Sequence, residues 1–276
     1  MRIDSPVLDF ETFVTSGGYQ TMKQHEAFLK QAKAHLREEL KPLPGKRHLY
    51  PELNMVAKFV ARKVQTTDHE KLIEDLFDYV KPELVLPILS LDGKRMKEVD
   101  MSADAAPFLL PPTYYVRPTL NKFGKRFTGV RDYLFGGQSK EELLTEIQMV
   151  TKKREASEEE YNQLKERLYL HAESEKTKQI STSIGSVSRI AHQPAWDMQL
   201  IYRELGEDFI KSFGKVSVTD LDEWVLTGRI PKSIVTKNRT VEDIKLDFIV
   251  MALDVEERIL NIHNRKRSRL SLRRHA

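Results

Sequence analysis

Residues 19–40 read YQTMKQHEAFLKQAKAHLREEL, and the spacing of their apolar side chains decides the fold class. These side chains recur mostly every three or four residues, which is the period of a helix with one buried face: Met22, Phe28, Leu29, Ala32, Leu36 and Leu40. Pro42, Pro44 and Gly45 then end the helix. Residues 1–18 lack such a pattern, and we expect them to be irregular.

The same helical spacing recurs on the C-terminal side of this stretch. It predicts a helix near residues 51–64, a helix over 67–80 that buries Leu72, Ile73, Leu76 and Phe77, and a helix over 196–213. A short helix near 219–227 follows. Apolar residues between Val241 and Ile262 recur at steps of three and four and predict a last amphipathic helix of about six turns.

Two capping-box patterns lie in the middle of the chain, Ser139 with Glu142 and Ser157 with Glu160. In a capping box the serine oxygen and the carboxylate satisfy backbone N–H groups at a helix start. The two patterns predict helices over 140–154 and 158–177, folded as an αα-hairpin arm. The small, polar stretch 181–188, STSIGSVS, predicts a linker after this arm.

One segment favours β structure. An apolar run from Leu84 to Leu91 is followed by Asp92-Gly93, which is a strong hairpin turn signal, and residues 94–101 alternate imperfectly. We expect a small β-hairpin over 84–101, with an irregular loop as the alternative.

The expected fold is therefore mainly α with a minor α+β character: a multi-helix domain with a small β-hairpin, an αα-hairpin arm and a C-terminal helix that ends in a basic tail. We expect a mixed domain over 1–138, the helical hairpin over 139–180 and a C-terminal helical region over 189–276, with the tail at 265–276.

The composition narrows the class of protein. The chain has 276 residues, of which 40% are hydrophobic and 31% charged, and this is typical of a globular protein with a core. No stretch approaches the roughly eighteen apolar residues of a membrane-spanning helix. Acidic residues stand where a signal peptide needs an apolar segment, and the absence of cysteine excludes disulfides and thiol catalysis. We expect a cytoplasmic, nuclear or intravirion protein that is not secreted.

The last fourteen residues, HNRKRSRLSLRRHA, form a local basic tail. They contain six cations and no acid: Arg265, Lys266, Arg267, Arg269, Arg273 and Arg274. The whole chain has a formal net charge of +4, so the rest of it is net negative. Such a cluster suits a polyanion, because the planar guanidinium fork matches phosphate. The alternatives are a disordered solubilising tail, a nuclear localisation signal, or charge that stabilises a helix C-terminus.

Residues 113–131, TYYVRPTLNKFGKRFTGVR, form a second basic segment without acids. Cations interleave with aromatic side chains, which is typical of proteins that bind single-stranded nucleic acid: Arg117, Lys122, Lys125 and Arg126 with Tyr115, Phe123 and Phe127. The alternative is that the aromatic side chains anchor the core while the cations solvate a loop.

Signatures of enzymes are missing from the sequence. It contains no P-loop, no dinucleotide fingerprint and no nucleophile elbow, and its eight histidines show no metal-ligand spacing. Residues 219–235 resemble a helix-turn-helix only superficially, because Glu223, Thr227 and Arg229 fall where buried apolar side chains are needed. We expect no enzyme activity, no cofactor, no metal and no sequence-specific reading.

These observations favour a non-enzymatic structural or accessory protein that contacts DNA or RNA without sequence specificity. A viral nucleoprotein, a virion or packaging component, or a replication accessory factor would fit. The alternative is an assembly subunit of a large complex, of virion, neck or tail type, whose basic tail docks on an acidic protein surface. In both cases we expect a homo-oligomer or a larger assembly.

Overall fold

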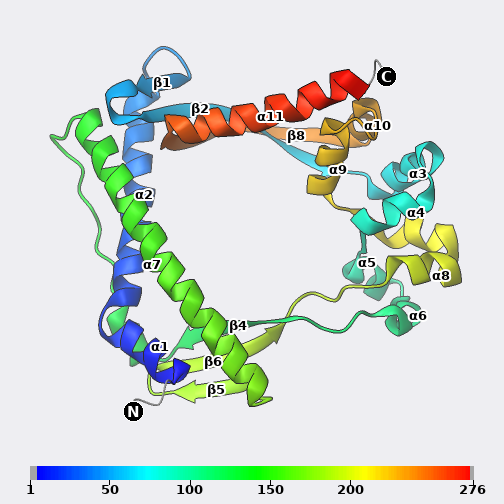
Figure 1. Cartoon of the computed structure of the whole chain (residues 1–276), viewed down its shortest axis with the longest axis horizontal. Coiled ribbons are helices and arrows are strands. Elements are labelled where there is room, and N and C mark those ends of the chain that lie inside the picture. The colour runs from blue at the N-terminus through cyan, green and yellow to red at the C-terminus, as the bar shows by residue number, and fades with distance from the viewer. Residues whose placement is uncertain (1–4, 274–276) are drawn as a thin grey trace. The chain divides into compact units, whose positions relative to one another are not determined.

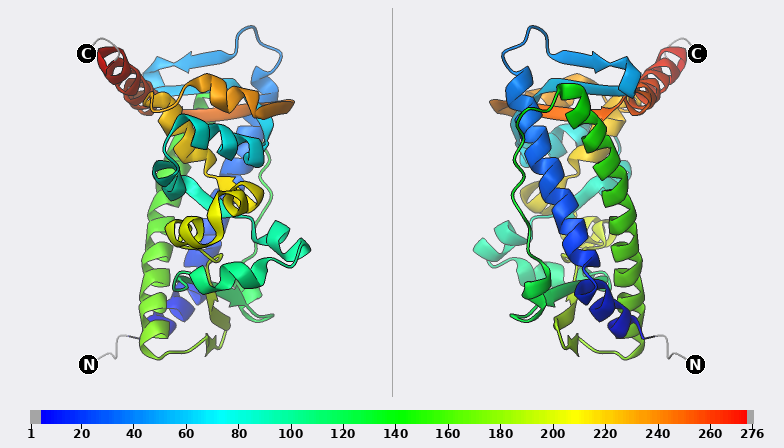
Figure 2. Two further views of the ribbon diagram at one scale, coloured as in Figure 1. Left: turned by 90° about the vertical axis from the view of Figure 1, so that its right-hand side faces the viewer. Right: turned by 90° about the vertical axis from the view of Figure 1, so that its left-hand side faces the viewer.

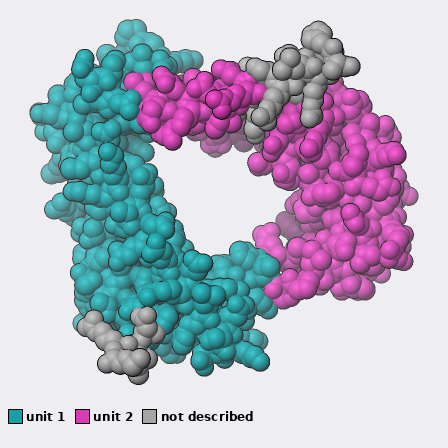
Figure 3. Space-filling model, in the orientation of Figure 1, with its two compact units in different colours: residues 1–58, 113–192, 248–252 teal, residues 59–112, 193–247, 253–276 magenta. Residues whose placement is uncertain are grey.

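The computed structural model describes residues 5–273, which form a mainly helical protein with small antiparallel sheets (Figure 1). The chain divides into two compact units, each assembled from segments that are far apart in sequence (Figure 3). Unit 1 comprises residues 1–58, 113–192 and 248–252, and unit 2 comprises residues 59–112, 193–247 and 253–276. No helix within the described residues is long and apolar enough to cross a bilayer.

Two long helices form the frame of unit 1, α2 (Gly18–Leu40) and α7 (Lys140–Ser174), and lie side by side (Figure 2). Helix α2 buries all six apolar residues that the sequence analysis selected, so this prediction is confirmed. The remaining elements of unit 1 are α1 (Pro6–Thr15), β1 (Arg47–Tyr50), the 3-10 turns η1 (Pro51–Leu53) and η4 (Gly124–Phe127), and the strands β4 (Tyr114–Leu120), β5 (Gln179–Thr182) and β6 (Gly185–Ala191).

The three strands of unit 1 form an antiparallel sheet in the order β4-β6-β5. One face of this sheet packs against α1 and α7 and forms a continuous apolar core: Phe10, Val14, Val116, Leu168, Ala172, Ile184 and Val187. The sheet is therefore covered on one side and open on the other.

Unit 2 has its own core, in which α3 (His69–Tyr79) packs against α8 (Met198–Phe213). The predicted buried set of α3 is confirmed. Around these helices lie α4 (Pro82–Val85), η2 (Leu86–Ile88), β3 (Leu89–Leu91), α5 (Gly93–Glu98), α6 (Ser102–Ala105), η3 (Ala106–Phe108), β7 (Gly214–Val216), α9 (Val218–Leu226), α10 (Lys232–Lys237) and α11 (Leu253–Arg273).

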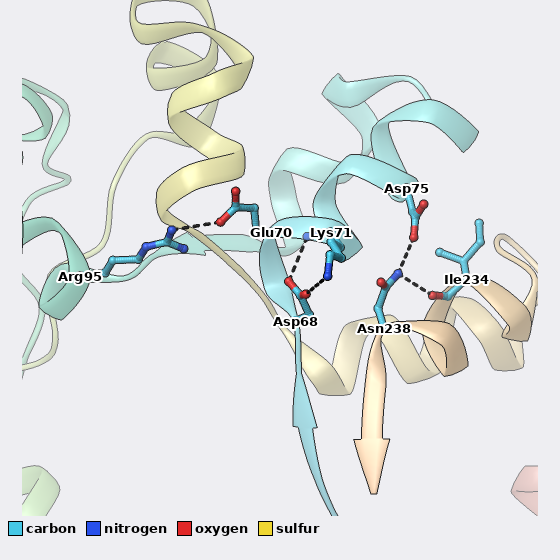
Figure 4. Close-up of polar contacts among 7 residues, drawn as sticks. All are labelled: Asp68, Glu70, Lys71, Asp75, Arg95, Ile234 and Asn238. Atoms are coloured by element: carbon cyan, nitrogen blue, oxygen red, sulfur yellow. Dashed lines mark hydrogen bonds and ion pairs between the residues drawn. The ribbon is translucent and has the colours of Figure 1, made fainter.

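Polar contacts fix the ends of α3 and its neighbours (Figure 4). The Asp68 carboxylate caps α3 by accepting from the backbone N–H of Lys71 at 3.2 Å, and it pairs with the Lys71 ammonium at 3.1 Å. Arg95 of α5 reaches Glu70 at 3.0 Å. The buried Asn238 amide donates to the Ile234 carbonyl at 3.0 Å and to Asp75, and these bonds tie the end of α10 to α3.

Strands β2 (Met55–Thr67) and β8 (Arg239–Ala252) pair with each other and are divided between the two units. The sequence analysis predicted helices at both places, and both predictions are wrong for these strands. Of the last predicted helix, residues 253–262 do lie in a helix, α11. In β8 the apolar residues also fit a two-residue period, as Ile244, Leu246, Phe248 and Val250 do. Branched side chains lose rotamer freedom in a helix and favour a strand, and here the pairing of two distant segments decides the outcome.

The predicted β-hairpin over 84–101 is also wrong. Residues 89–91 do form a strand, but β3 pairs with β7 at residues 214–216. Asp92 begins a helix instead of a turn, because its carboxylate accepts from the backbone N–H groups of Lys94 and Arg95 at 3.1 and 3.2 Å. An aspartate before a glycine is as good an N-cap as it is a turn residue.

The predicted αα-hairpin is one continuous helix, α7, of 35 residues. The capping box of Ser139 and Glu142 is present at its start. Ser157 lies inside the helix, where its hydroxyl donates to the Lys153 carbonyl, and no glycine or proline interrupts residues 140–174.

Two further segments differ from the expectation. Residues 6–15, expected to be irregular, form the helix α1. Residues 181–188, expected to be a linker, supply most of the β5–β6 hairpin, because small hydroxyl side chains are compatible with a strand that has one open face.

Candidate nucleic-acid interface

The basic segment 113–131 lies in unit 1, where its first part is the strand β4. Along this strand Tyr115, Arg117 and Thr119 are exposed, whereas Val116 is buried in the core. The two-residue period of a strand therefore places Tyr115 and Arg117 on the open face of the sheet.

The open face continues across the neighbouring strands with small polar side chains. Arg117 lies opposite Ser188, and Thr119 lies opposite Ser186 on β6. On β5, Gln179 and Ser181 lie opposite the same two serines. Directly opposite residues of antiparallel strands share one face, so a patch of hydroxyl and amide groups surrounds the arginine. The sequence analysis missed this patch because it interpreted residues 181–188 as a linker.

The second part of the segment is held at the end of the sheet by Asn121. Its side-chain amide donates to the Ser183 carbonyl at 3.1 Å, and its side-chain oxygen accepts from the Gly124 backbone N–H at 2.9 Å. The Gly124 backbone packs so closely on the β5–β6 turn that an added Cβ would lie 2.2 Å from the Ile184 carbonyl oxygen. The turn η4 therefore has a fixed position.

From this turn Lys122, Phe123, Lys125 and Arg126 project into solvent. The Phe123 and Phe127 rings meet edge-on, with their centres 5.4 Å apart. The Arg126 guanidinium lies 5.9 Å from the centre of the Phe123 ring. Phe127 is half-buried against the apolar core of unit 1. The structure thus brings these five residues together and makes Phe127 the anchor on which Phe123 rests.

Four cations of this segment differ from the arginines of the described residues that pair with acids, such as Arg62, Arg167 and Arg189. Within the described residues, Arg117, Lys122, Lys125 and Arg126 form no ion pair with an acid. Arg189, on the neighbouring strand, instead pairs with Glu173 at 3.2 Å and lies 4.1 Å from the centre of the Tyr114 ring. An exposed cation without an acidic partner is available to an external anion.

The basic tail belongs to unit 2. Arg265 is exposed, and the helical backbone of α11 runs to Arg273, so positions 265, 269 and 273 share one helix face. The side chains of Lys266, Arg267, Arg269 and Arg273 are not described, and Arg274 lies outside the described residues.

Sequence reasoning also missed a cavity of about 580 Å³ in unit 2. Its wall includes Trp196 and the cations Lys94, Lys97 and Lys215. Lys215 pairs with Asp92 at 2.9 Å, and this hydrogen bond lowers the pKa of the Asp92 carboxyl. No motif could have revealed the cavity, because its residues come from separate segments.

Comparison with known proteins gives no match to a family model, a curated protein or a solved structure. No three histidine, aspartate or glutamate side chains of the described residues come together in a way that could hold a metal ion.

Proposed function

We propose that this chain is a non-enzymatic accessory protein that binds nucleic acid without sequence specificity, through the basic segment 113–131 and the basic tail. The observation that carries the proposal is the group of four exposed cations that have no acidic partner within the described chain: Arg117, Lys122, Lys125 and Arg126. Such cations release counterions when they neutralise phosphates, and this release supplies most of the affinity in non-specific binding.

Exposed aromatic rings beside the cations favour a single strand over a duplex. Tyr115 is exposed on the open face of the sheet, and Phe123 is 46% exposed on η4. Bases of any identity stack on such rings, because every base has a π face. The serine and threonine hydroxyls between β4 and β5 can bond to phosphate and sugar oxygens, which position a strand without reading its sequence.

No feature of this surface points to sequence recognition. The open face belongs to a sheet and a short 3-10 turn, and neither presents a helix that could enter a major groove. We propose that the protein acts as a viral nucleoprotein, a virion or packaging component, or a replication accessory factor.

The experiment is fluorescence anisotropy with a labelled single strand and a labelled duplex at two salt concentrations. The test variant replaces the four cations of the segment by glutamine. The control variant removes the same charge from other exposed positions of unit 1: Lys41, Lys46, Lys152 and Lys153. We expect the test variant to weaken binding at least about tenfold. The slope of log K against log salt concentration should become shallower by up to about 3, because each lost single-strand phosphate contact contributes about 0.7.

The control variant should bind like the unchanged chain. Equal loss in both variants would mean that net charge alone matters, and this result would refute an interface at 113–131. A chain that ends at Asn264 measures the contribution of the tail separately. Absence of binding by every form would refute the whole proposal.

The alternative function is that of an assembly subunit whose basic tail docks on an acidic protein. The exposed Arg265 supports this alternative no less than it supports phosphate binding. Docking on a protein would persist in the absence of nucleic acid and would not require the four cations of segment 113–131.

A further inference from the structure

Within the described residues, the part of the β2/β8 ribbon that belongs to unit 2, residues 59–67 and 239–247, consists of two strands. Strand β1 pairs with β2 through residues 55–58 and extends no further. Arg62 contacts Asp247 at 2.5 Å and Thr66 contacts Glu242, so the two strands run in opposite directions. Two-stranded ribbons are marginally stable in water unless another element covers them.

This ribbon carries aliphatic side chains that the described chain leaves in solvent. Val60 and Val241 are exposed, and Ile244 is 61% exposed. Helix α11 runs back alongside the strands in the views of Figures 1 and 2, and it exposes Ile259, Leu260 and Ile262. A cluster of exposed aliphatic residues on a long edge strand is typical of a protein-protein interface.

The triplet Asp243-Ile244-Lys245 indicates which protein covers the ribbon. Strand β8 is the edge of its sheet in the described structure. Asp243 and Lys245 are both exposed, and neither forms an ion pair within the described residues. The Ile244 backbone N–H donates to the Asp243 carboxylate at 2.7 Å, so a side chain occupies an amide that a neighbouring strand could use.

We infer that a second copy of this chain pairs with β8 in antiparallel orientation, with the two-fold axis at Ile244. An antiparallel pairing about this residue places Asp243 of each copy opposite Lys245 of the other and sets the two Ile244 side chains against each other. Opposite charges on directly facing residues stabilise such a ladder, and a two-fold axis forms each pair twice.

The same register leaves the other charges of the strand satisfied. Asp247 already pairs with Arg62, and Glu242 already bonds to Thr66, within one chain. Asp247, opposite Val241 of the second copy, therefore brings a charge that Arg62 compensates. Glu242, opposite Leu246, keeps its hydrogen bond from the Thr66 hydroxyl. A polyanion would instead require an excess of cations, and the triplet has one charge of each sign.

The test uses the full chain, freed of nucleic acid, in sedimentation equilibrium over a range of concentrations. We expect a reversible dimer. Asp243→Lys or Lys245→Asp alone would set like charges opposite each other twice and raise the dissociation constant at least about tenfold. The double variant D243K/K245D restores opposite charges in the same register and should restore the dimer.

The control is Leu134→Asp, because Leu134 of unit 1 is 99% exposed and lies outside the ribbon. It should leave association unchanged. Circular dichroism confirms that each variant is folded. A monomer at all concentrations, single variants that dimerise normally, or a double variant that stays dissociated would each overturn the inference. The test contains no nucleic acid, so its outcome is independent of the proposed function.

Discussion

The β4-β6-β5 sheet and the β2/β8 ribbon are both built from distant pieces of the chain. The sheet has a covered face, whereas residues 60–67 and 240–246 of the ribbon include no buried side chain. Helices α1 and α7 bury one side of the sheet and leave hydroxyl groups and Arg117 on the other. The ribbon exposes Ile244 and its aliphatic neighbours instead. A polar face is stable in water and can bind a soluble ligand reversibly. An exposed apolar face instead marks a surface that another protein covers.

The largest expected effect is the difference in unfolding free energy lost when a buried leucine of the sheet's core and the exposed isoleucine of the ribbon are each truncated. Leu168→Ala removes a fully buried side chain and should lower the free energy of unfolding by about 3 kcal/mol. Ile244→Ala, measured at concentrations where the chain is monomeric, should change it by less than about 0.5 kcal/mol. Urea denaturation measures both values, and equal losses would mean that the ribbon is covered within one chain.

A second test concerns the close packing that fixes the candidate interface. The added Cβ of Gly124→Ala would collide with the Ile184 carbonyl oxygen, so unit 1 should lose about 2 kcal/mol of stability. Binding of single-stranded nucleic acid should weaken as well, because Lys122 and Lys125 lie at the turn η4 that this packing fixes. Gly136→Ala is the control, since nothing lies within 4 Å of its added Cβ. Similar behaviour of both variants would contradict a fixed turn.

A third test concerns the helix that covers the sheet. Ser139→Ala removes the N-cap of α7 and should cost about 1 kcal/mol. Ser157→Ala replaces an interior helix residue by the best helix former and should be neutral or stabilising by a few tenths of a kcal/mol. Thermal unfolding compares the two variants. A loss at position 157 as large as that at 139 would indicate two helices.

The smallest expected effect concerns the ion pair between Lys215 and Asp92 in unit 2. The hydrogen bond from Lys215 lowers the pKa of Asp92, so Asp92 stabilises the fold above its unfolded pKa of about 3.8, and this contribution is lost as the pH falls. Asp92→Asn keeps the helix cap but loses the charge, and should cost about 0.5 kcal/mol at pH 7. The difference should shrink as the pH falls below about 3.8 and should be lost once the pH is below the lowered pKa of the folded chain. A difference that is the same at every pH would contradict the ion pair.

Local patterns were predictable from the sequence wherever one segment decides its own structure. Helix α2 and the buried face of α3 follow from apolar spacing, and the start of α7 follows from the Ser139 capping box. The period of residues 241–252 was ambiguous, because their apolar residues fit the spacing of a strand as well as that of a helix. Only the pairing with β2 resolves it, through contacts between residues 176 and 185 positions apart.

The candidate interface was predictable in its residues but not in its surroundings. The sequence indicated the cations and aromatic rings of segment 113–131, and whether they bind nucleic acid stays a prediction. That Arg117 would lack an acidic partner while Arg189 has one depends on which face of the sheet each occupies. Asn121 and Gly124 hold η4 in place by their contacts with the β5–β6 turn. These contacts could not be predicted while residues 181–188 were interpreted as a linker.

The most direct test of the contrast between sheet and ribbon is hydrogen exchange of the backbone amides at several protein concentrations, without nucleic acid. We predict that the β6 amides, residues 185–191, are equally protected at every concentration, because helices of the same unit cover that sheet. The β8 amides, residues 240–247, should exchange rapidly in dilute protein and become protected as the dimer forms. Protection of β8 that is already complete in dilute protein, or that never changes with concentration, would contradict this account.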